Sequence, residues 1–156
     1  MAKFVKSLGI VVLVLLVLAA IGITATIGWR PFIGSKSRAL TDRKFAATPE
    51  RLKRGTYLAE HVSGCTDCHT LFKDGPNGQE SVAAMKGAGQ LFPIPGFPGR
   101  LVASNITPDP ETGIGTWTDD QLARAIREGI GRDGRTLFPL MPYSHFRHMT
   151  DEDLAS

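Results

Sequence analysis

The chain of 156 residues is long enough for one small domain, and its formal net charge is +3. This charge is unevenly spread, at +2 over residues 1–29, +6 over residues 30–54 and −5 over residues 55–156. Because most of the positive charge precedes the main part of the chain, the composition argues against nucleic-acid binding. Two cysteines are too few for a disulfide framework.

An apolar segment follows Lys3 and Lys6 at the N-terminus, and residues 7–29 carry no charge. About twenty residues at a rise of about 1.5 Å span the roughly 30 Å hydrocarbon core of a bilayer. A cleaved signal peptide is the alternative, but its apolar region is usually about 7–15 residues long, and the best small-x-small site, Ala20-Ile21-Gly22, lies inside the run. The sequence therefore predicts a retained transmembrane anchor over residues 1–29, with Trp29 and Phe32 at the interface.

Residues 30–48 form a basic linker, and their composition indicates a segment that is either flexible or ordered by contact. Lys3 and Lys6 favour a cytoplasmic N-terminus, whereas the basic residues just after the anchor oppose it by the positive-inside rule. These residues are Arg30, Lys36, Arg38, Arg43 and Lys44. Charge alone therefore leaves the orientation open.

The sequence Thr48-Pro49 marks a helix start, with Thr48 as the N-cap and Pro49 at the first helical position. We predict that this helix continues to about Val62 and that its C-terminal end positions Cys65. Gly55 either allows another helix to approach closely or is a tolerated helix glycine.

The pentapeptide Cys65-Thr66-Asp67-Cys68-His69 is a C-x-x-C-H haem-attachment signature. Its thiols are spaced to reach the two vinyl groups of one haem, and the adjacent imidazole can bind the iron. Zinc normally takes four protein ligands, so a zinc site would need further histidines from elsewhere in the chain. A thioredoxin-like dithiol is expected after a strand, and no β-branched run precedes Cys65. Covalent haem is therefore the favoured interpretation.

Residues 70–115 are so rich in Gly and Pro that long regular elements are not expected. An irregular stretch of this length needs something else to order it. A large flat apolar cofactor can do so, with the apolar side chains of the stretch available to face it: Leu91, Phe92, Ile94, Phe97, Leu101, Val102 and Ile106.

A second helix begins at Thr118, with Gln121 in the capping-box position and Gly129 as terminator. Residues 131–135 follow as a turn, and residues 137–143 form an apolar segment too rich in proline to be helical. Thr150 opens a third helix shortly before Ser156.

The second axial ligand of a haem iron in an electron carrier is often methionine, which raises the reduction potential. Met141 is our preferred candidate because it lies between Leu140 and Pro142 on a stiff backbone. His145 is the second choice and an open distal site is the third. The remaining candidates are Met85, Met149, His61 and His148.

With these segments identified, the chain resembles class I c-type cytochromes. It is most similar to the membrane-anchored, single-haem cytochromes and cytochrome-subunit domains of bacterial alcohol and aldehyde dehydrogenases. The resemblance covers residues 48–154 and depends on Arg54-Gly55-x-Tyr57-Leu58 ahead of C-x-x-C-H, Ser104-Asn105-Ile106-Thr107-Pro108-Asp109, Gly113-Ile114-Gly115-x-Trp117-Thr118, Arg127-Glu128-Gly129 and Leu140-Met141-Pro142-Tyr143.

This resemblance implies an all-α, cytochrome c-like domain over residues 49–156, with few short helices and long loops around the haem. It implies thioether bonds at Cys65 and Cys68, His69 as the proximal ligand and Met141 as the distal ligand. The family closes its fold with a C-terminal helix crossing the first helix, and only the opening of that helix is present here. We therefore expect Gly55 and Tyr57 to face an unfilled gap, with reduced stability.

The expected function is that of a single-electron carrier with one covalent haem c per chain, in a periplasmic-side respiratory or dehydrogenase-linked chain. We expect no enzymatic activity of its own, but membership of a dehydrogenase complex fits, with a dehydrogenase subunit, a terminal oxidase or another cytochrome as redox partners. The expected location is the bacterial inner membrane, with a single span and a periplasmic haem domain, or the periplasm after signal cleavage. The alternative function is a small-ligand sensor or peroxidase-like enzyme with an open distal site.

Overall fold

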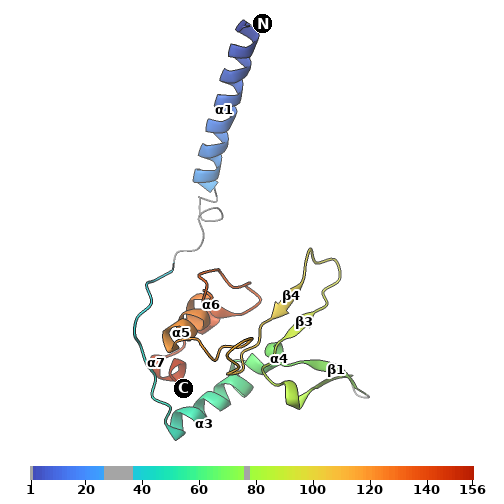
Figure 1. Ribbon diagram of the computed structural model, residues 1–156, viewed down its shortest axis with the longest axis vertical. Coiled ribbons are helices and arrows are strands. Elements are labelled where there is room, and N and C mark those ends of the chain that lie inside the picture. Colours follow the sequence, from blue (N-terminus) through green and yellow to red (C-terminus); the bar gives the residue numbers. More distant parts are fainter. Residues whose placement is uncertain (1, 27–36, 76–77) are drawn as a thin grey trace.

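The computed structural model describes residues 2–26, 37–75 and 78–156. Its first element, α1 (Ala2–Thr26), extends away from the rest of the chain (Figure 1). Over Phe4–Thr26 this helix is long and apolar enough to cross a membrane, although a signal sequence has the same properties. Trp29 and Phe32, which we predicted at the interface, lie outside the described residues.

The helix predicted to start at Thr48-Pro49 begins there, and the Thr48 hydroxyl caps it by accepting a hydrogen bond of 3.3 Å from the Arg51 amide. Helix α3 (Pro49–Tyr57) passes directly into a wider π-helical turn, η1 (Leu58–Val62). The predicted end near Val62 is therefore confirmed. The short helix α4 (Cys65–His69) follows and contains the whole pentapeptide.

The stretch rich in Gly and Pro contains two antiparallel hairpins, which we had not predicted. Strands β1 (Phe72–Gly75) and β2 (Gly78–Ser81) pair with Phe72 opposite Ser81. After the single turn η2 (Ala83–Met85), β3 (Gln90–Phe92) and β4 (Leu101–Ala103) pair with Gln90 opposite Ala103. The structure thus adds two small sheets to the helical fold that the sequence predicted.

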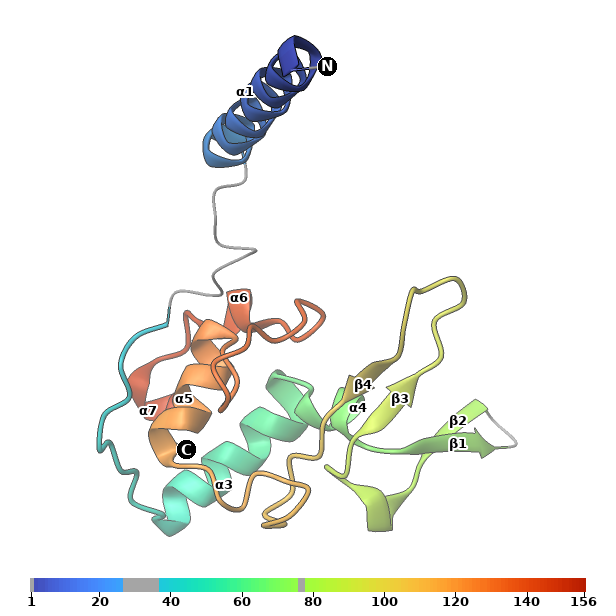
Figure 2. The ribbon, with the colours of Figure 1, turned by 45° about the horizontal axis from the view of Figure 1, so that its top comes forward.

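Helix α5 (Asp119–Glu128) has the predicted capping box, in which Thr118 and Gln121 exchange hydrogen bonds of 2.9 and 3.2 Å. Gly129 ends it in the left-handed conformation, at a φ of 65°. Helices α6 (Tyr143–Phe146) and α7 (Asp151–Leu154) complete the chain. In Figures 1 and 2 the hairpins lie on one side of α4, and α5, α6 and α7 lie on the other.

The linker is ordered by contact over its described part. The carboxylate of Asp120, in the first turn of α5, accepts two hydrogen bonds of 2.6 Å from the Arg38 guanidinium and one of 2.6 Å from the Thr41 amide. The Phe45 amide donates to Asp119 at 2.7 Å. Residues 38–45 therefore lie against α5 before the chain enters α3. This part of the linker is thus ordered by contact and is not flexible.

The core is small and centres on α5. Its buried apolar side chains are Leu58, Ala123, Ala125, Ile130 and Leu154. Among buried polar side chains Asp120 is fully enclosed, with no exposed area. The Arg38 guanidinium keeps the pKa of the Asp120 carboxyl well below its usual range, so this carboxylate is charged within the fold.

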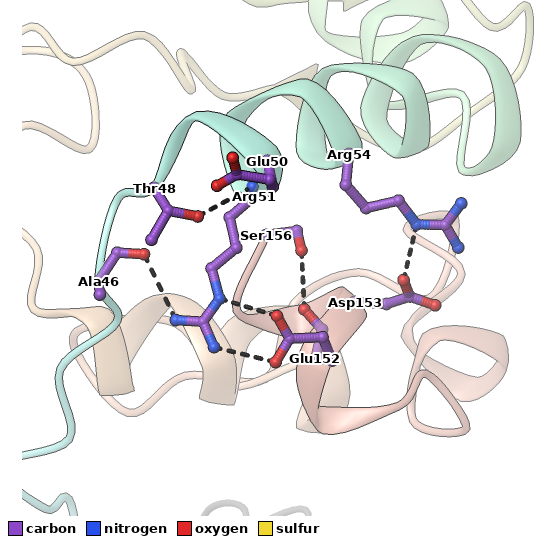
Figure 3. Close-up of a pocket in the computed structure, with 8 residues that line it drawn as sticks. All are labelled: Ala46, Thr48, Glu50, Arg51, Arg54, Glu152, Asp153 and Ser156. Atoms are coloured by element: carbon purple, nitrogen blue, oxygen red, sulfur yellow. Dashed lines mark hydrogen bonds and ion pairs between the residues drawn. The ribbon is translucent and has the colours of Figure 1, made fainter.

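The expected gap beside Gly55 is wrong, because the backbone of Ser156 lies directly against this glycine. Figure 3 shows how α7 meets α3: the Arg51 guanidinium donates to both carboxylate oxygens of Glu152 at 2.8 and 2.9 Å, and Arg54 donates to Asp153 at 2.8 Å. These pairs border an open pocket of about 570 Å³. The close approach of the Ser156 backbone therefore explains the glycine at position 55, which is not merely a tolerated helix glycine. The Tyr57 side chain is 51% exposed.

Candidate haem-binding site

Helix α4 places Cys65, Cys68 and His69 on one helical turn. Gly64 precedes it at a φ of 62°, a left-handed conformation that glycine adopts without strain. Spacings of three and four residues put Cys68 and His69 on the same face as Cys65. Both cysteines are free thiols with partly exposed side chains. Local folding alone thus brings together the two sulfurs and the imidazole.

The Cys65 thiol does not have the environment of a reactive redox thiol. Burial raises the pKa of the Cys65 thiol, with smaller contributions in the same direction from Cys68 and Asp67. Reactive dithiols of the thioredoxin type instead need a lowered thiol pKa to form the attacking thiolate. A zinc site gains no support either, because the described residues contain no group of three or more His, Cys, Asp and Glu side chains placed to hold a metal ion.

The orientation of His69 is fixed by a hydrogen bond of 2.6 Å between its Nδ1 and the carbonyl oxygen of Ser104. Since a carbonyl only accepts, Nδ1 is the protonated nitrogen that donates. The lone pair is therefore on Nε2, the nitrogen that remains for a metal. A backbone carbonyl that fixes the tautomer in this way also fixes the orientation of the imidazole as a ligand.

Ser104 is held in place by the folded loop that follows β4. The Asn105 side chain accepts from the amide of Thr107 at 2.8 Å and donates to the hydroxyl of Thr112 at 2.8 Å. The Ile114 amide then donates to the Thr107 carbonyl at 2.9 Å. This loop contains the N-I-T-P-D segment of the sequence, so the segment has a structural role beside His69.

The carbonyl groups at the end of α4 bond to the beginning of the β3–β4 hairpin. The Gly89 amide donates to the His69 carbonyl at 2.7 Å, and the Gln90 side chain donates to the Cys68 carbonyl at 3.1 Å. Sequence reasoning missed Ser104 and Gln90 as supports of the site. Only the resemblance over the N-I-T-P-D segment pointed to this region, because hydrogen bonds to carbonyl groups leave no residue pattern.

Met141 lies on a different part of the chain, between α5 and α6. Its amide donates to the Phe138 carbonyl at 3.1 Å, its carbonyl accepts from the Tyr143 amide at 2.8 Å, and its side chain is partly buried. Met85 is more exposed, in η2, and His145 and His148 are exposed in and after α6. The structure joins Cys65, Cys68 and His69 in one turn, and Met141 as distal ligand stays a prediction.

The donor set and its surroundings fit a covalently attached haem. Two thiols and an imidazole with a free Nε2 are the groups that such a cofactor needs on its proximal side. Several large apolar side chains of η1, the two hairpin regions and the segment around Met141 are more than a third exposed: Val62, Leu71, Leu91, Ile94, Val102, Phe138 and Leu140. A flat apolar ligand held at α4 would shield side chains of this kind from water.

No family model matches the chain. Curated relatives include a nicotinate dehydrogenase subunit of Pseudomonas putida, which is 39% identical over an alignment of 147 residues that covers 88% of this chain and 10% of that protein. The cytochrome c subunit of alcohol dehydrogenase (quinone) from Gluconobacter oxydans is 38% identical over 105 residues, 67% of this chain and 20% of the relative. A diheme cytochrome c-type protein of Cereibacter sphaeroides is 31% identical over 94 residues, 60% of this chain and 30% of the relative.

The chain thus spans only a tenth to three tenths of the length of these three relatives. Further relatives are named as cytochrome subunits of fructose dehydrogenase and gluconate 2-dehydrogenase. The resemblance that the sequence motifs predicted is confirmed: this chain is a relative of the cytochrome c subunits of bacterial dehydrogenases.

Proposed function

We propose that the protein is a single-electron carrier with one haem attached covalently through Cys65 and Cys68. The observation that carries this proposal is the geometry of α4, where both thiols and the imidazole share one turn and the Ser104 carbonyl fixes Nδ1 of His69. The names of the relatives support an electron-transfer subunit and not a catalytic enzyme.

The haem would supply reversible one-electron chemistry at its iron, with no substrate bond broken. His69 would hold the iron through Nε2, and its bond to Ser104 keeps the ring from rotating. Met141 would hold the other side through its thioether, a soft donor that favours the reduced metal and so raises the potential. The apolar side chains of the hairpins and of the Met141 segment would exclude water.

Helix α1 would anchor the carrier in the bacterial inner membrane, with the haem domain on the periplasmic side. This side follows from the family resemblance, since c-type haem is attached there. A dehydrogenase subunit is the proposed electron donor, as in the complexes named for the relatives. A terminal oxidase or another cytochrome is the proposed acceptor. Protection of the domain from protease in intact cells, and its loss in spheroplasts, would support this topology, whereas a mature N-terminus beyond residue 26 would establish the cleaved, secreted alternative.

Covalent attachment is tested by producing the full chain in a haem-competent host and staining a denaturing gel for haem peroxidase activity. We expect a stained band at the size of the polypeptide, and its loss when Cys65→Ser and Cys68→Ser are combined. His61→Ala is the matched control, because His61 is an exposed imidazole close to the motif. An unstained wild-type band with both thiols open to alkylation would refute the proposal.

The alternative is a sensor or peroxidase-like enzyme in which the distal side of the iron is open. Carbon monoxide distinguishes the two, because a methionine ligand must leave before the gas can bind. We expect the spectrum of the reduced wild type to change little and that of Met141→Ala to shift rapidly. A rapid shift in the wild type would instead favour the open site.

A further inference from the structure

Helix α5 carries two arginines whose guanidinium groups donate hydrogen bonds to carbonyl groups of residues 131–149. Arg124 and Arg127 are three residues apart and so lie on the same face of α5. The Arg124 side chain is only 6% exposed, and Nε of each arginine is buried without a hydrogen-bond partner in the described part of the chain. An unpaired buried N–H group lowers the stability of the fold, and hydrogen bonds from the terminal guanidinium nitrogens offset this loss.

Those contacts fall at the two ends of one segment, residues 131–149. Nη2 of Arg124 donates to the Gly131 carbonyl at 2.8 Å and more weakly to the Arg132 carbonyl at 3.4 Å. Nη2 of Arg127 donates to the Met149 carbonyl at 2.6 Å. The two arginines therefore grip the start and the end of a segment that contains Met141 near its middle.

The middle of this segment is also fixed to the C-terminal end of α5. The Leu137 amide donates to the Gly129 carbonyl at 2.7 Å. The ring of Tyr143 packs so closely on Gly129 that a Cβ there would lie 2.5 Å from a ring carbon. Apart from the four residues of α6 and the isolated bridge between Thr136 and Ile130, the described segment has no regular structure. Contacts with α5 therefore help to fix its conformation, together with turn hydrogen bonds inside the segment and the ring contact between Phe138 and Phe97.

We propose that Arg124 and Arg127 are positioning residues that hold residues 131–149 in the conformation that keeps the Met141 sulfur on the iron. This inference rests on the proposed function. A thioether is a weak ligand, so its residence on the metal depends on how far the backbone around it can move. Charged donors on carbonyl groups form strong, directional bonds that restrict such movement.

The test uses the haem-loaded full chain in detergent and compares Arg124→Lys and Arg127→Lys with the wild type. Lysine keeps the charge but loses the planar fork that reaches the carbonyl groups. We expect carbon monoxide to bind the reduced variants about tenfold faster or more, the factor expected from the loss of one hydrogen bond to a charged group. The reduction potential should fall, and the red absorption band of methionine-ligated ferric haem should weaken.

Arg54→Lys is the matched control, since Arg54 pairs with Asp153 of α7 and forms no hydrogen bond or ion pair with the described residues 131–149. It should keep wild-type rates and potential. Where Arg124→Lys fails to load haem, Arg127→Gln provides the second variant, because it removes the ion pair of 2.7 Å with Asp151 and the guanidinium fork together. It should show the same change in rate.

Two results separate the possible failures. If Met141→Ala leaves carbon monoxide binding and the potential unchanged, methionine ligation itself is wrong and this inference falls with it. If Met141→Ala changes both while the lysine variants behave like Arg54→Lys, the carrier function stands and the positioning role of the two arginines is refuted.

Discussion

Replacing Arg38 should destabilise the folded part of the chain around α5, although Arg38 lies in the linker that follows α1. Its guanidinium forms a bidentate pair with the fully buried carboxylate of Asp120, at 2.6 Å for each bond, and a further bond of 2.7 Å with Glu128. Arg38→Met keeps much of the aliphatic stem and removes the charge. The Asp120 carboxylate would then remain buried with the neutral donors of Thr41, its amide at 2.6 Å and its side-chain hydroxyl.

The size of the effect follows from the burial of the two partners. Breaking a buried pair by removing one member costs about 3–5 kcal/mol, because the other charge is left uncompensated. The Arg38 side chain is 36% exposed, so water screens part of the interaction. We therefore expect the free energy of unfolding to fall by about 2–3 kcal/mol.

Denaturant unfolding of the haem-loaded full chain, followed by circular dichroism, measures this change. Arg43→Met is the matched control in the same linker, since Arg43 contacts the ring of Phe45 and pairs with no carboxylate among the residues that the structure describes. It should stay within about 0.5 kcal/mol of the wild type. Adding Asp120→Asn to Arg38→Met should restore part of the loss, because a neutral amide costs less to bury than a carboxylate. Equal stability of the Arg38 and Arg43 variants would refute the reasoning.

Three further predictions follow from the same contacts. The folded-state pKa of Asp120 lies below its unfolded value of about 3.9, so its contribution to stability is present above about pH 4 and is lost as the pH falls below that value. Between about pH 6 and 3, the free energy of unfolding should therefore fall more steeply for the wild type than for Arg38→Met. Thr118→Ala removes the capping hydroxyl of α5 and should cost about 1 kcal/mol in denaturant unfolding, with an unchanged midpoint as the contradicting result. Gly89→Ala should reduce haem loading, measured as haem per polypeptide, because Gly89 has a φ of 85° and its Cβ would collide with the backbone of β4; loading equal to wild type would show that the hairpin is dispensable for the site.

The sequence alone was sufficient for features that depend on neighbouring residues. Helix starts at Thr48, Thr118 and Thr150 are caps in which a hydroxyl bonds an amide three residues later, so the pattern and the contact lie together in the chain. The same holds for α4, since one turn of helix brings Cys65, Cys68 and His69 to one face. The apolar length of α1 similarly follows from residue composition.

Only the tertiary structure decided the contacts between distant segments. The bond between His69 and the Ser104 carbonyl spans 35 residues, and that between Arg38 and Asp120 spans 82. Ser156 fills the gap expected at Gly55, and residues 38–45 bond to α5 and are not a flexible linker. No periodic pattern in the sequence indicates either contact. A backbone carbonyl is the same in every residue, and a basic residue in a linker carries no mark of its partner. The helices and the turn α4 thus depend on local sequence. The orientation of the His69 ring and the contact of residues 38–45 with α5 depend on the packed fold.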